Sequence, residues 1–420
     1  MKAKHHLSIL ASSHRWNTAL GNFLRGATIP RSALWIAPLL AIVCVVSDYC
    51  LSNLSLPLSE NSSTLWLPAI ITRENSPVPD DIVMYDVAYD KELVPVVDPE
   101  YGDTLGVRTI TSRSRLQSLL DALKESSYRY LFIDIRFESA DQTDCDSALF
   151  AKLRQMPRMC LSTHVAGRDY EIADTTLLKY AGYNDFRNFI FNDFSHYEVL
   201  QYGQPSVAER MYEAIDGKNV THRWGPVYTS GNHLCYNNLF LPLTKIGINP
   251  QNDTIAPLDD FTTMMPSFIL GREILDIMPM EEIHAQVSDK IVLVGDFVND
   301  LHSTYVGDVP GALLAYAAYK ELHAGNHLVN WPYILTILVL YTLIGLCMLM
   351  RHPLYAVVLD RCRINLWQLR FLLSLIGYGA IIYLTMIACY LIWHISLNIL
   401  VPTLVFGLLA LCLSIKKSYE

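Results

Sequence analysis

The stretch KIVLVGDFVNDLHST, residues 290–304, decides the fold. Its first part is a run of four apolar residues, 291–294, which ends at Gly295 and leads directly into acidic and amide side chains. A short, continuous apolar run of this kind is typical of a strand that is buried on both faces, as in a parallel sheet covered by helices. The polar loop then lies at the carboxyl end of a strand, where open α/β sheets bind their ligands.

Strands and helices alternate through much of the remaining chain. Further strands are expected over residues 81–87, 128–135 and 158–164, helices over 115–127, 146–156, 208–217, 266–276 and 310–325, and loops over 77–79 and 95–103. The helix over 115–127, for example, places Leu116, Leu119, Leu120 and Leu123 on one face. The sequence therefore predicts an α/β domain with a mixed or parallel sheet flanked by helices.

Hydrophobic residues make up 51% of the 420 residues, which favours membrane-spanning helices. Four segments approach the roughly 20 apolar residues that a bilayer requires. They are residues 33–50, 332–350, 371–393 and 396–415. For the first segment a buried core helix stays an alternative, because Ser47, Asp48 and Tyr49 interrupt its end. A cleavable signal peptide is less favoured, because the preceding segment is long and no small-x-small cleavage site follows.

Basic residues predict the orientation of these spans. Lys and Arg are concentrated in residues 1–32, 351–370 and 416–420. The positive-inside rule assigns all three segments to the cytoplasm. Residues 51–331, with a core over about 80–329, are then extracytoplasmic. This domain holds Cys145, Cys160 and Cys235, an odd number that leaves one disulfide between two of them open.

Polar side chains follow three of the expected strands and form the candidate ligand-binding set. The set is Asp86, Asp134, Arg136, Glu138, Asp296, Asp300 and His302. If the strands are parallel neighbours, these side chains meet at one edge of the sheet. The alternative is that they are ordinary turn and cap residues. Arg113 is expected to pair with one of these carboxylates.

Several functional classes are disfavoured or left without a motif. A net charge of −9 without a basic cluster argues against nucleic-acid binding. The sequence has no GxxxxGK[ST], G-x-S-x-G or HExxH pattern, so no cofactor or reaction class can be named. We therefore expect no enzyme activity. A metal site or a catalytic pair at Asp300 and His302 stays an alternative with weak support from a few loop side chains.

The order of several motifs resembles a known family. DIVMYDVAYD (81–90), SRSRLQSLLDAL (112–123), YRYLFIDIRFES (128–139), a D-x-D-x-A-L segment (144–149) and PSFILGREIL (266–275) come in turn. KIVLVG, Asp300, Pro310-Gly311 and a helix that runs to Leu322 then precede a membrane span. This order resembles the CHASE type 2 sensory domain, an extracytoplasmic module of bacterial transmembrane receptors.

The resemblance implies a multi-pass sensor in a bacterial inner membrane, with a periplasmic ligand- or partner-binding domain. Transmission to the membrane helices is expected to involve Pro310, Gly311, Gly325 and Trp331. The segment after the last span is too short for an output domain, so a separate output protein is expected as partner, beside the lipid bilayer. Such sensors often work as dimers, which adds a second copy of the chain. The alternative is a scaffold or accessory subunit of a cell-envelope complex.

Overall fold

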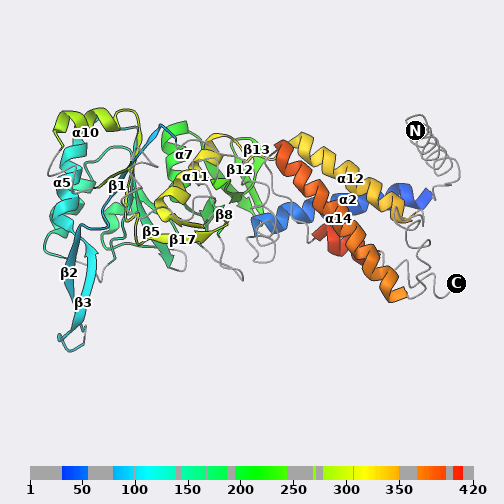
Figure 1. Cartoon of the computed structure of the whole chain (residues 1–420), viewed down its shortest axis with the longest axis horizontal. Coiled ribbons are helices and arrows are strands. Elements are labelled where there is room, and N and C mark those ends of the chain that lie inside the picture. Colours follow the sequence, from blue (N-terminus) through cyan, green and yellow to red (C-terminus); the bar gives the residue numbers. More distant parts are fainter. Residues whose placement is uncertain are drawn as a thin grey trace, which may run out of the picture. The chain divides into compact units, whose positions relative to one another are not determined.

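The chain forms two units (Figure 1). The apolar unit takes in residues 1–48, 330–393 and 399–420, and the sheet domain takes in residues 49–329 and 394–398. The computed structural model describes residues 31–54, 79–98, 100–138, 143–166, 169–186, 194–243, 268–270, 278–305, 307–349, 367–393 and 401–409.

The sheet domain is built on a seven-stranded sheet with the order β15-β1-β16-β4-β5-β6, in which β7 also pairs with β5. Its strands are β1 (Ile82–Asp86), β4 (Tyr130–Asp134), β5 (Met159–Ala166), β6 (Asp169–Glu171), β7 (Ala181–Tyr183), β15 (Phe268–Leu270) and β16 (Ile291–Gly295). Every pairing is parallel except that of β6 with β5. The predicted mixed α/β sheet is confirmed.

Helices cover both faces of this sheet (Figure 1). On one face lie α5 (Arg113–Lys124), α6 (Asp146–Leu153) and α10 (Met280–Val287), and on the other lie α7 (Val207–Asp216) and α11 (Gly311–His323). Val83, Tyr85 and Val294 belong to the core of the first face. Because side chains alternate along a strand, the side chains at the alternate positions, such as that of Asp86, face α7 and α11.

Helices α5 and α7 form where the sequence predicts, for identifiable local reasons. In α5 the four leucines of the expected face, Leu116, Leu119, Leu120 and Leu123, are all buried. Helix α7 begins at Ser206, whose hydroxyl accepts a hydrogen bond from the backbone N–H of Glu209 at 3.2 Å. It ends at Gly217, which takes the left-handed conformation with φ of 66°.

Helix α11 is almost completely buried and is tied to the first strand of the sheet. The hydroxyl of Tyr316 donates to Oδ1 of Asp81 at 2.6 Å, and Nζ of Lys320 lies 3.2 Å from Oδ2 of the same residue. Asp81 directly precedes β1. The expected helix over 310–325 is therefore confirmed as a central element of the domain.

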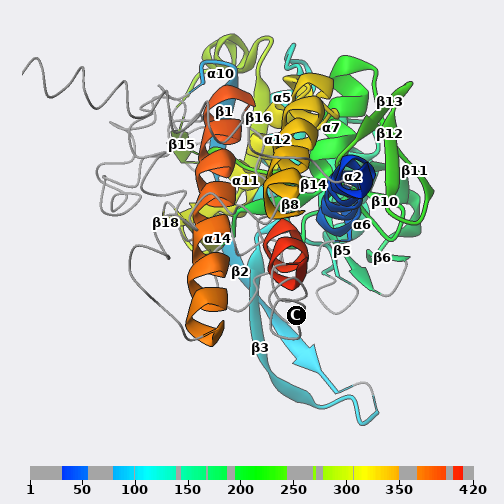
Figure 2. The same cartoon turned by 90° about the vertical axis from the view of Figure 1, so that its right-hand side faces the viewer.

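A two-stranded ribbon, the arm, extends away from the sheet (Figures 1 and 2). It consists of β2 (Lys91–Val97) and β3 (Thr104–Thr111). Residues 95–97 are strand rather than the expected loop, so that prediction is wrong for them. Proline is tolerated at Pro95 because a two-stranded ribbon has open edges, where the absence of an N–H costs no ladder hydrogen bond.

The expected helix over 266–276 is wrong where the structure describes it. Residues 268–270 form β15, which pairs in parallel with β1. The other residues of that prediction lie outside the described part of the chain. Helix α10, in contrast, was not expected.

Small antiparallel sheets and one 3₁₀ helix complete the sheet domain. They are β11 (Val220–Trp224), β12 (Val227–Ser230) and β13 (His233–Cys235), then β8 (His196–Glu198) with β14 (Asn238–Phe240), β9 (Leu200–Gln201) with β10 (Gln204–Pro205), β17 (Leu301–Thr304) with β18 (Gly307–Pro310), and η2 (Thr175–Tyr180). Strands β17 and β18 lie between β16 and α11 in sequence, and so position the polar loop of the opening stretch.

Within the described residues, three helices are long and apolar enough to cross a membrane. They are found in α2 (Arg31–Asn53), α12 (Trp331–Leu349) and α14 (Trp367–Trp393). They correspond to the first three expected spans. Of the fourth, residues 401–409 are helical, and the rest of the segment lies outside the described residues.

Helices α2 and α12 pack closely in the apolar unit because small residues face one another. Ala33, Ala37 and Ala41 recur every fourth position of α2, and all are buried. A Cβ built on Gly345 of α12 would lie only 3.1 Å from Cβ of Ala37. Such spacing of small residues is characteristic of helix pairs that approach closely in a membrane.

Candidate functional site

The carboxyl ends of β1, β16 and β4 lie side by side at one edge of the sheet. Asp86, Gly295 and Asp134 are neighbours in register across these three parallel strands. Gly295 therefore separates the two aspartates. The candidate residues are arranged around them in two groups.

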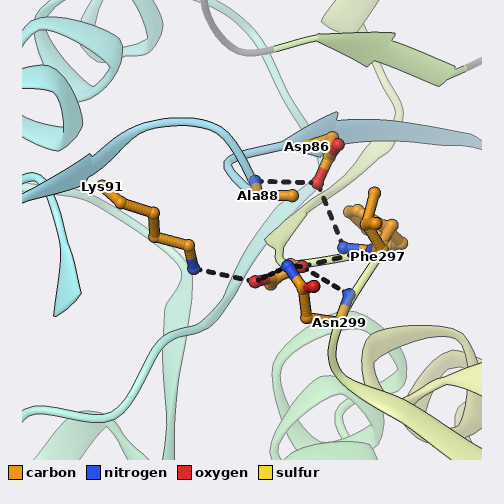
Figure 3. Close-up of polar contacts among 7 residues, drawn as sticks. Asp86, Ala88, Lys91, Phe297 and Asn299 are labelled. Carbon is orange, nitrogen blue, oxygen red and sulfur yellow. Dashed lines mark hydrogen bonds and ion pairs between the residues drawn. The ribbon is translucent and has the colours of Figure 1, made fainter. Parts of the chain in front are cut away.

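Asp86 belongs to the first group and holds two loops together (Figure 3). Its Oδ1 accepts hydrogen bonds from the backbone N–H of Ala88 at 3.0 Å and of Phe297 at 3.1 Å. These bonds join the loop after β1 to the loop after β16. Burial raises the pKa of Asp86, and the neighbouring charge of Asp296 acts in the same direction.

Asp296 completes this group by joining the arm to the loop after β16, through Lys91 and Asn299, which Figure 3 labels. Its carboxylate accepts from Nζ of Lys91, the first residue of the arm, at 2.7 Å, and from the backbone N–H of Asn299 at 2.8 Å. Burial acts to raise the pKa of Asp296, but the bonds from Lys91 and Asn299 hold it below its usual value. These contacts give Asp86 and Asp296 a structural role.

Asp134 begins the second group, at the end of β4. It is half-buried, and its Oδ1 accepts a hydrogen bond from Nδ2 of Asn184 at 3.1 Å. Asn184 comes directly after β7. Burial raises the pKa of Asp134 to about 6, and the neighbouring carboxylate of Asp300 contributes to this rise. Two carboxylates close together oppose each other's ionisation.

Asp300 and His302 lie at the start of α11. Nε2 of His302 is 3.3 Å from Oδ1 of Asp300, and the His302 ring lies against Phe186 with centroids 4.2 Å apart. A Cβ on Gly311, the first residue of α11, would lie 3.1 Å from Nε2 of His302 and 3.2 Å from Oδ2 of Asp300. Glycine at this position therefore lets the helix end approach both side chains.

Asp185 is the third carboxylate of the second group and has basic neighbours. It contacts Nδ1 of His164, near the end of β5, and lies 3.8 Å from the guanidinium of Arg136. We name this second group the acidic rim. It comprises Asp134, Asp185 and Asp300 with Arg136, His164, Asn184 and His302. Asn184, Asp185 and His164 were not among the candidates, because nothing in their local sequence places them beside β4.

Two further expectations have different outcomes. Glu138 follows β4 by four residues and forms no hydrogen bond or ion pair with another residue that the structure describes. Arg113 pairs with Asp146 instead of a carboxylate at the strand ends, so that prediction is wrong. Its Nε lies 3.1 Å from Oδ1 of Asp146, both side chains are buried, and the guanidinium covers the ring of Phe137. This ion pair joins α5 to α6.

A second feature, the junction, was also not predicted. It contains the last residues of α2, which belong to the sheet domain from Tyr49 onward. The hydroxyl of Tyr49 donates to the carbonyl of Cys235 at 3.0 Å, and the rings of Tyr49 and Tyr236 lie 5.5 Å apart. The side chain of Asn53 accepts from the N–H of Asn237 at 2.8 Å and donates to the carbonyl of Pro226 at 2.9 Å.

The segment that leads out of the sheet domain toward α12 contacts the same part of the chain, residues 234–237. The N–H of Tyr236 donates to the carbonyl of His327 at 2.8 Å, and the N–H of Val329 donates to Leu234 at 2.9 Å. Burial lowers the pKa of His327 to about 4, so this residue is neutral at neutral pH. The junction thus consists of Tyr49, Asn53, residues 234–237 and residues 327–329. In the sequence, the polar residues at the end of the first span are what could have indicated this junction.

The four residues expected in transmission mark the two ends of α11 and the start of α12. Pro310 caps the N-terminus of α11, and Gly311 begins the helix. Gly325 follows its C-terminus with φ of 77°, a left-handed conformation that favours glycine. Trp331 begins α12. Only five residues, 326–330, therefore connect Gly325 to a membrane-type helix.

The described cysteines are all free. Cys145 is exposed, whereas Cys160 and Cys235 are buried, and burial raises the pKa of each buried thiol to about 12. No pair among the three forms the disulfide that the sequence left open. Among the residues that the structure describes, no group of three or more His, Cys, Asp or Glu side chains is placed to hold a metal ion. The acidic rim thus consists of charged and hydrogen-bonding side chains.

Comparison with known protein families gives a match. The sequence model of the CHASE2 domain matches residues 91–349, which is more than half of the chain. No curated protein and no solved structure matches the chain.

Proposed function

We propose, from the premise that the chain belongs to the CHASE2 family of extracytoplasmic sensory domains, that it is a membrane sensor without enzyme activity of its own. Its sheet domain binds a ligand or partner, and its membrane helices pass this event to a separate output protein. The junction carries this proposal. One segment, residues 234–237, which runs from the end of β13 to the start of β14, binds both the end of α2 and the connection that leads to α12.

Three apolar helices support the anchoring, and the helical residues 401–409 fit a fourth span. With four spans, the three basic segments all lie in the cytoplasm, as the positive-inside rule requires. The chain is then a multi-pass protein of a bacterial inner membrane, with both termini in the cytoplasm. The sheet domain lies in the periplasm.

The path of transmission follows from the order of contacts. Asp300 and His302 of the acidic rim lie against the first residue of α11, so binding there acts directly on this helix. The C-terminus of α11 leads through residues 326–330 to α12, and the junction holds this connection beside the end of α2. Ligand binding is proposed to shift the population between two arrangements of these segments, by its difference in affinity for them.

The test measures whether the junction controls the membrane helices. In a cysteine-free background, single cysteines replace Leu335, Val339 or Leu343, which are exposed on α12. Disulfide cross-linking rates between copies of the chain are then compared with and without Tyr49→Phe. This substitution removes only the hydroxyl that bonds to Cys235. Rates are expected to change at least twofold at one or more positions.

The matched control is Tyr101→Phe, which alters an exposed tyrosine at the tip of the arm. It should leave all three rates unchanged. Identical rates in the parent, Tyr49→Phe and Tyr101→Phe backgrounds would contradict transmission through the junction.

The arm favours the second candidate function, a scaffold or accessory subunit of an envelope complex. Leu93, Leu105 and Val107 are each about two-thirds exposed, and Leu93 and Val107 lie on the same face of the ribbon. An isolated two-stranded ribbon is only marginally stable in water, so a protein partner would stabilise it. This function predicts a complex that depends on Leu93 and Val107 and persists without small molecules. It also predicts that Tyr49→Phe leaves the cross-linking rates in α12 unchanged.

A further inference from the structure

One buried histidine of the junction has an imidazole ring without a hydrogen bond. His327 is 0% exposed, and neither Nδ1 nor Nε2 of its ring has a hydrogen-bond partner among the described residues. A buried polar group without a partner is costly, and such groups are rare in folded proteins. This one lies in the connection from the sheet domain to α12, at the residue whose carbonyl accepts from the N–H of Tyr236.

The surroundings of the His327 ring suit a neutral imidazole and oppose a charged one. The ring makes a T-shaped contact with Tyr212 of α7, with centroids 5.4 Å apart. Burial lowers the pKa of His327 to about 4, and the positive charge of Lys218 acts in the same direction. Glu209 of α7 is no counter-ion at neutral pH, because burial raises its pKa to about 8. Strand β13 contributes the buried thiol of Cys235, whose pKa burial raises to about 12.

Charged side chains that lie close to His327 in the sequence bind other partners. The carboxylate of Glu321 accepts a hydrogen bond from Nδ2 of Asn326 at 2.7 Å. Nδ1 of His323 lies 2.7 Å from Oδ1 of Asp216. A proton on His327 therefore finds no carboxylate within hydrogen-bonding distance in the described part of the chain.

We infer that the junction is a pH-sensitive switch, which opens when the ring of His327 takes up a proton. A charged imidazole is far less stable in this buried position than in water. Movement of the ring toward water is expected to displace its own carbonyl, which binds Tyr236, and so to release the connection to α12 from residues 234–237. Protonated histidines switch interfaces in other pH sensors. The inference rests on the proposed function of the junction and names acid as its stimulus.

The direction of the pH effect follows from the two environments of the ring. An imidazole in water takes up a proton near pH 6.5, whereas the buried ring of His327 does so near pH 4. Above about pH 6.5 both forms are neutral, so the junction keeps its full stability. Between about pH 6.5 and pH 4 the open form binds more protons than the closed form, so opening increases as pH falls.

The test follows opening through Cys235, which is 0% exposed and pairs with Leu328 of the connection. Full-length protein in detergent, with Cys235 as its only cysteine, reacts with dithiodipyridine at pH 7.5 and pH 5. Each rate is divided by the rate of the denatured chain at the same pH, which removes the pH dependence of the thiol reaction. The corrected rate should rise about tenfold in acid.

Two substitutions remove the proton-binding ring. His327→Phe keeps an aromatic ring beside Tyr212, and His327→Leu provides a smaller apolar side chain in case the larger ring disturbs packing. In both variants the corrected rate at Cys235 should be the same at the two pH values.

Matched controls separate a local switch from unfolding of the whole domain. His323→Gln removes an exposed histidine four residues earlier and should keep the acid response of the parent. A chain whose only cysteine is Cys160, buried in β5, should stay unreactive at both pH values.

The inference is overturned if the corrected rate at Cys235 does not rise in acid, if both His327 variants keep the rise, or if Cys160 responds equally. Acid opening at Cys235 together with unaltered cross-linking in α12 at the two pH values would instead overturn transmission and leave the switch intact.

Discussion

Gly295 shows how one residue shapes the candidate site. A Cβ at this position would lie 3.2 Å from Cβ of Asp134 and 3.8 Å from Cβ of Ala312 in α11. The first distance is tighter than ordinary packing, so a side chain here would displace Asp134 or the helix. Glycine at the end of β16 thus allows the acidic rim and the start of α11 to lie against the sheet edge.

The raised pKa of Asp134 makes stability depend on pH in a direction opposite to that of an ion-paired carboxylate. Its pKa is about 6 in the folded chain, against an ordinary value of 3.8, because of burial and the charge of Asp300. Below about pH 4 both folded and unfolded chains are protonated. Between pH 4 and pH 6 the folded chain binds more protons, so its free energy of unfolding falls as pH rises.

Asp134→Asn is expected to remove this fall in the free energy of unfolding between pH 4 and pH 6. The variant should match the parent near pH 4 and exceed its stability by about 1–2 kcal/mol at pH 7.5, a figure reduced for solvent screening of a half-buried group. Unfolding measured from pH 4 to 8 checks the difference. The control variant Asp289→Asn should instead be less stable than the parent at pH 7.5, because the hydrogen bond from Arg129 lowers the pKa of Asp289. A difference independent of pH would contradict the assignment.

At the scale of elements, α2 is one continuous helix whose apolar part and domain-bound end have different surroundings. Up to Asp48 it belongs to the apolar unit, and from Tyr49 it belongs to the sheet domain. Hydrogen bonds of Tyr49 and Asn53 hold this end to residues 234–237, between β13 and β14. The end of α2 is therefore part of the sheet domain, although the helix as a whole is long and apolar enough to cross a membrane.

The anchoring of α2 is tested by Asn53→Ala. This change leaves the N–H of Asn237 without its acceptor, and burying an unpaired backbone donor costs about 1–3 kcal/mol. Hydrogen exchange at peptides that contain Asn237 should therefore accelerate. Asn299→Ala serves as control, because its hydrogen bonds are made to Asp296 in the first acidic group. Equal exchange in both variants would show that Asn53 does not secure the helix end.

Local sequence predicts an element well where its own periodicity dominates. The leucines of α5 and the run 291–294 are such cases, and both are buried as expected. Residues 268–270 form a strand because they pair with β1, a tertiary contact that overrides the local pattern of a short apolar run. Pro95 was expected in a loop, yet an open ribbon edge accommodates it.

The candidate site was predictable only as far as strand ends can be recognised. Their parallel register brings Asp86 and Asp134 to one edge, as the alternation of elements suggested. The division into two groups depends on contacts that lie far apart in sequence. Lys91 and Asp296, for instance, are 205 residues apart, and their hydrogen bond exists only in the folded domain. No local pattern reports such a pair.

At the scale of the whole molecule, the proposed topology can be read from thiol reactivity. Cys145 is exposed in the sheet domain, whereas Cys160 and Cys235 are buried and their pKa values are raised to about 12. Because the thiolate is the reactive form, the two buried residues should stay unmodified in the folded chain. Cys145 therefore reports on which side of the membrane the sheet domain lies.

A small, membrane-impermeant maleimide should label Cys145 in intact cells if the sheet domain is periplasmic. In a background without the native cysteines, Lys417→Cys should be labelled only after the inner membrane is permeabilised, because the basic segments are proposed to lie in the cytoplasm. Both sites are compared with detergent-solubilised protein, which gives the full extent of labelling. Labelling of Lys417→Cys in intact cells would show that the number of spans is odd. Protection of Cys145 in intact cells would reverse the orientation of the sheet domain, and with it the assignment of the acidic rim to an outward-facing ligand.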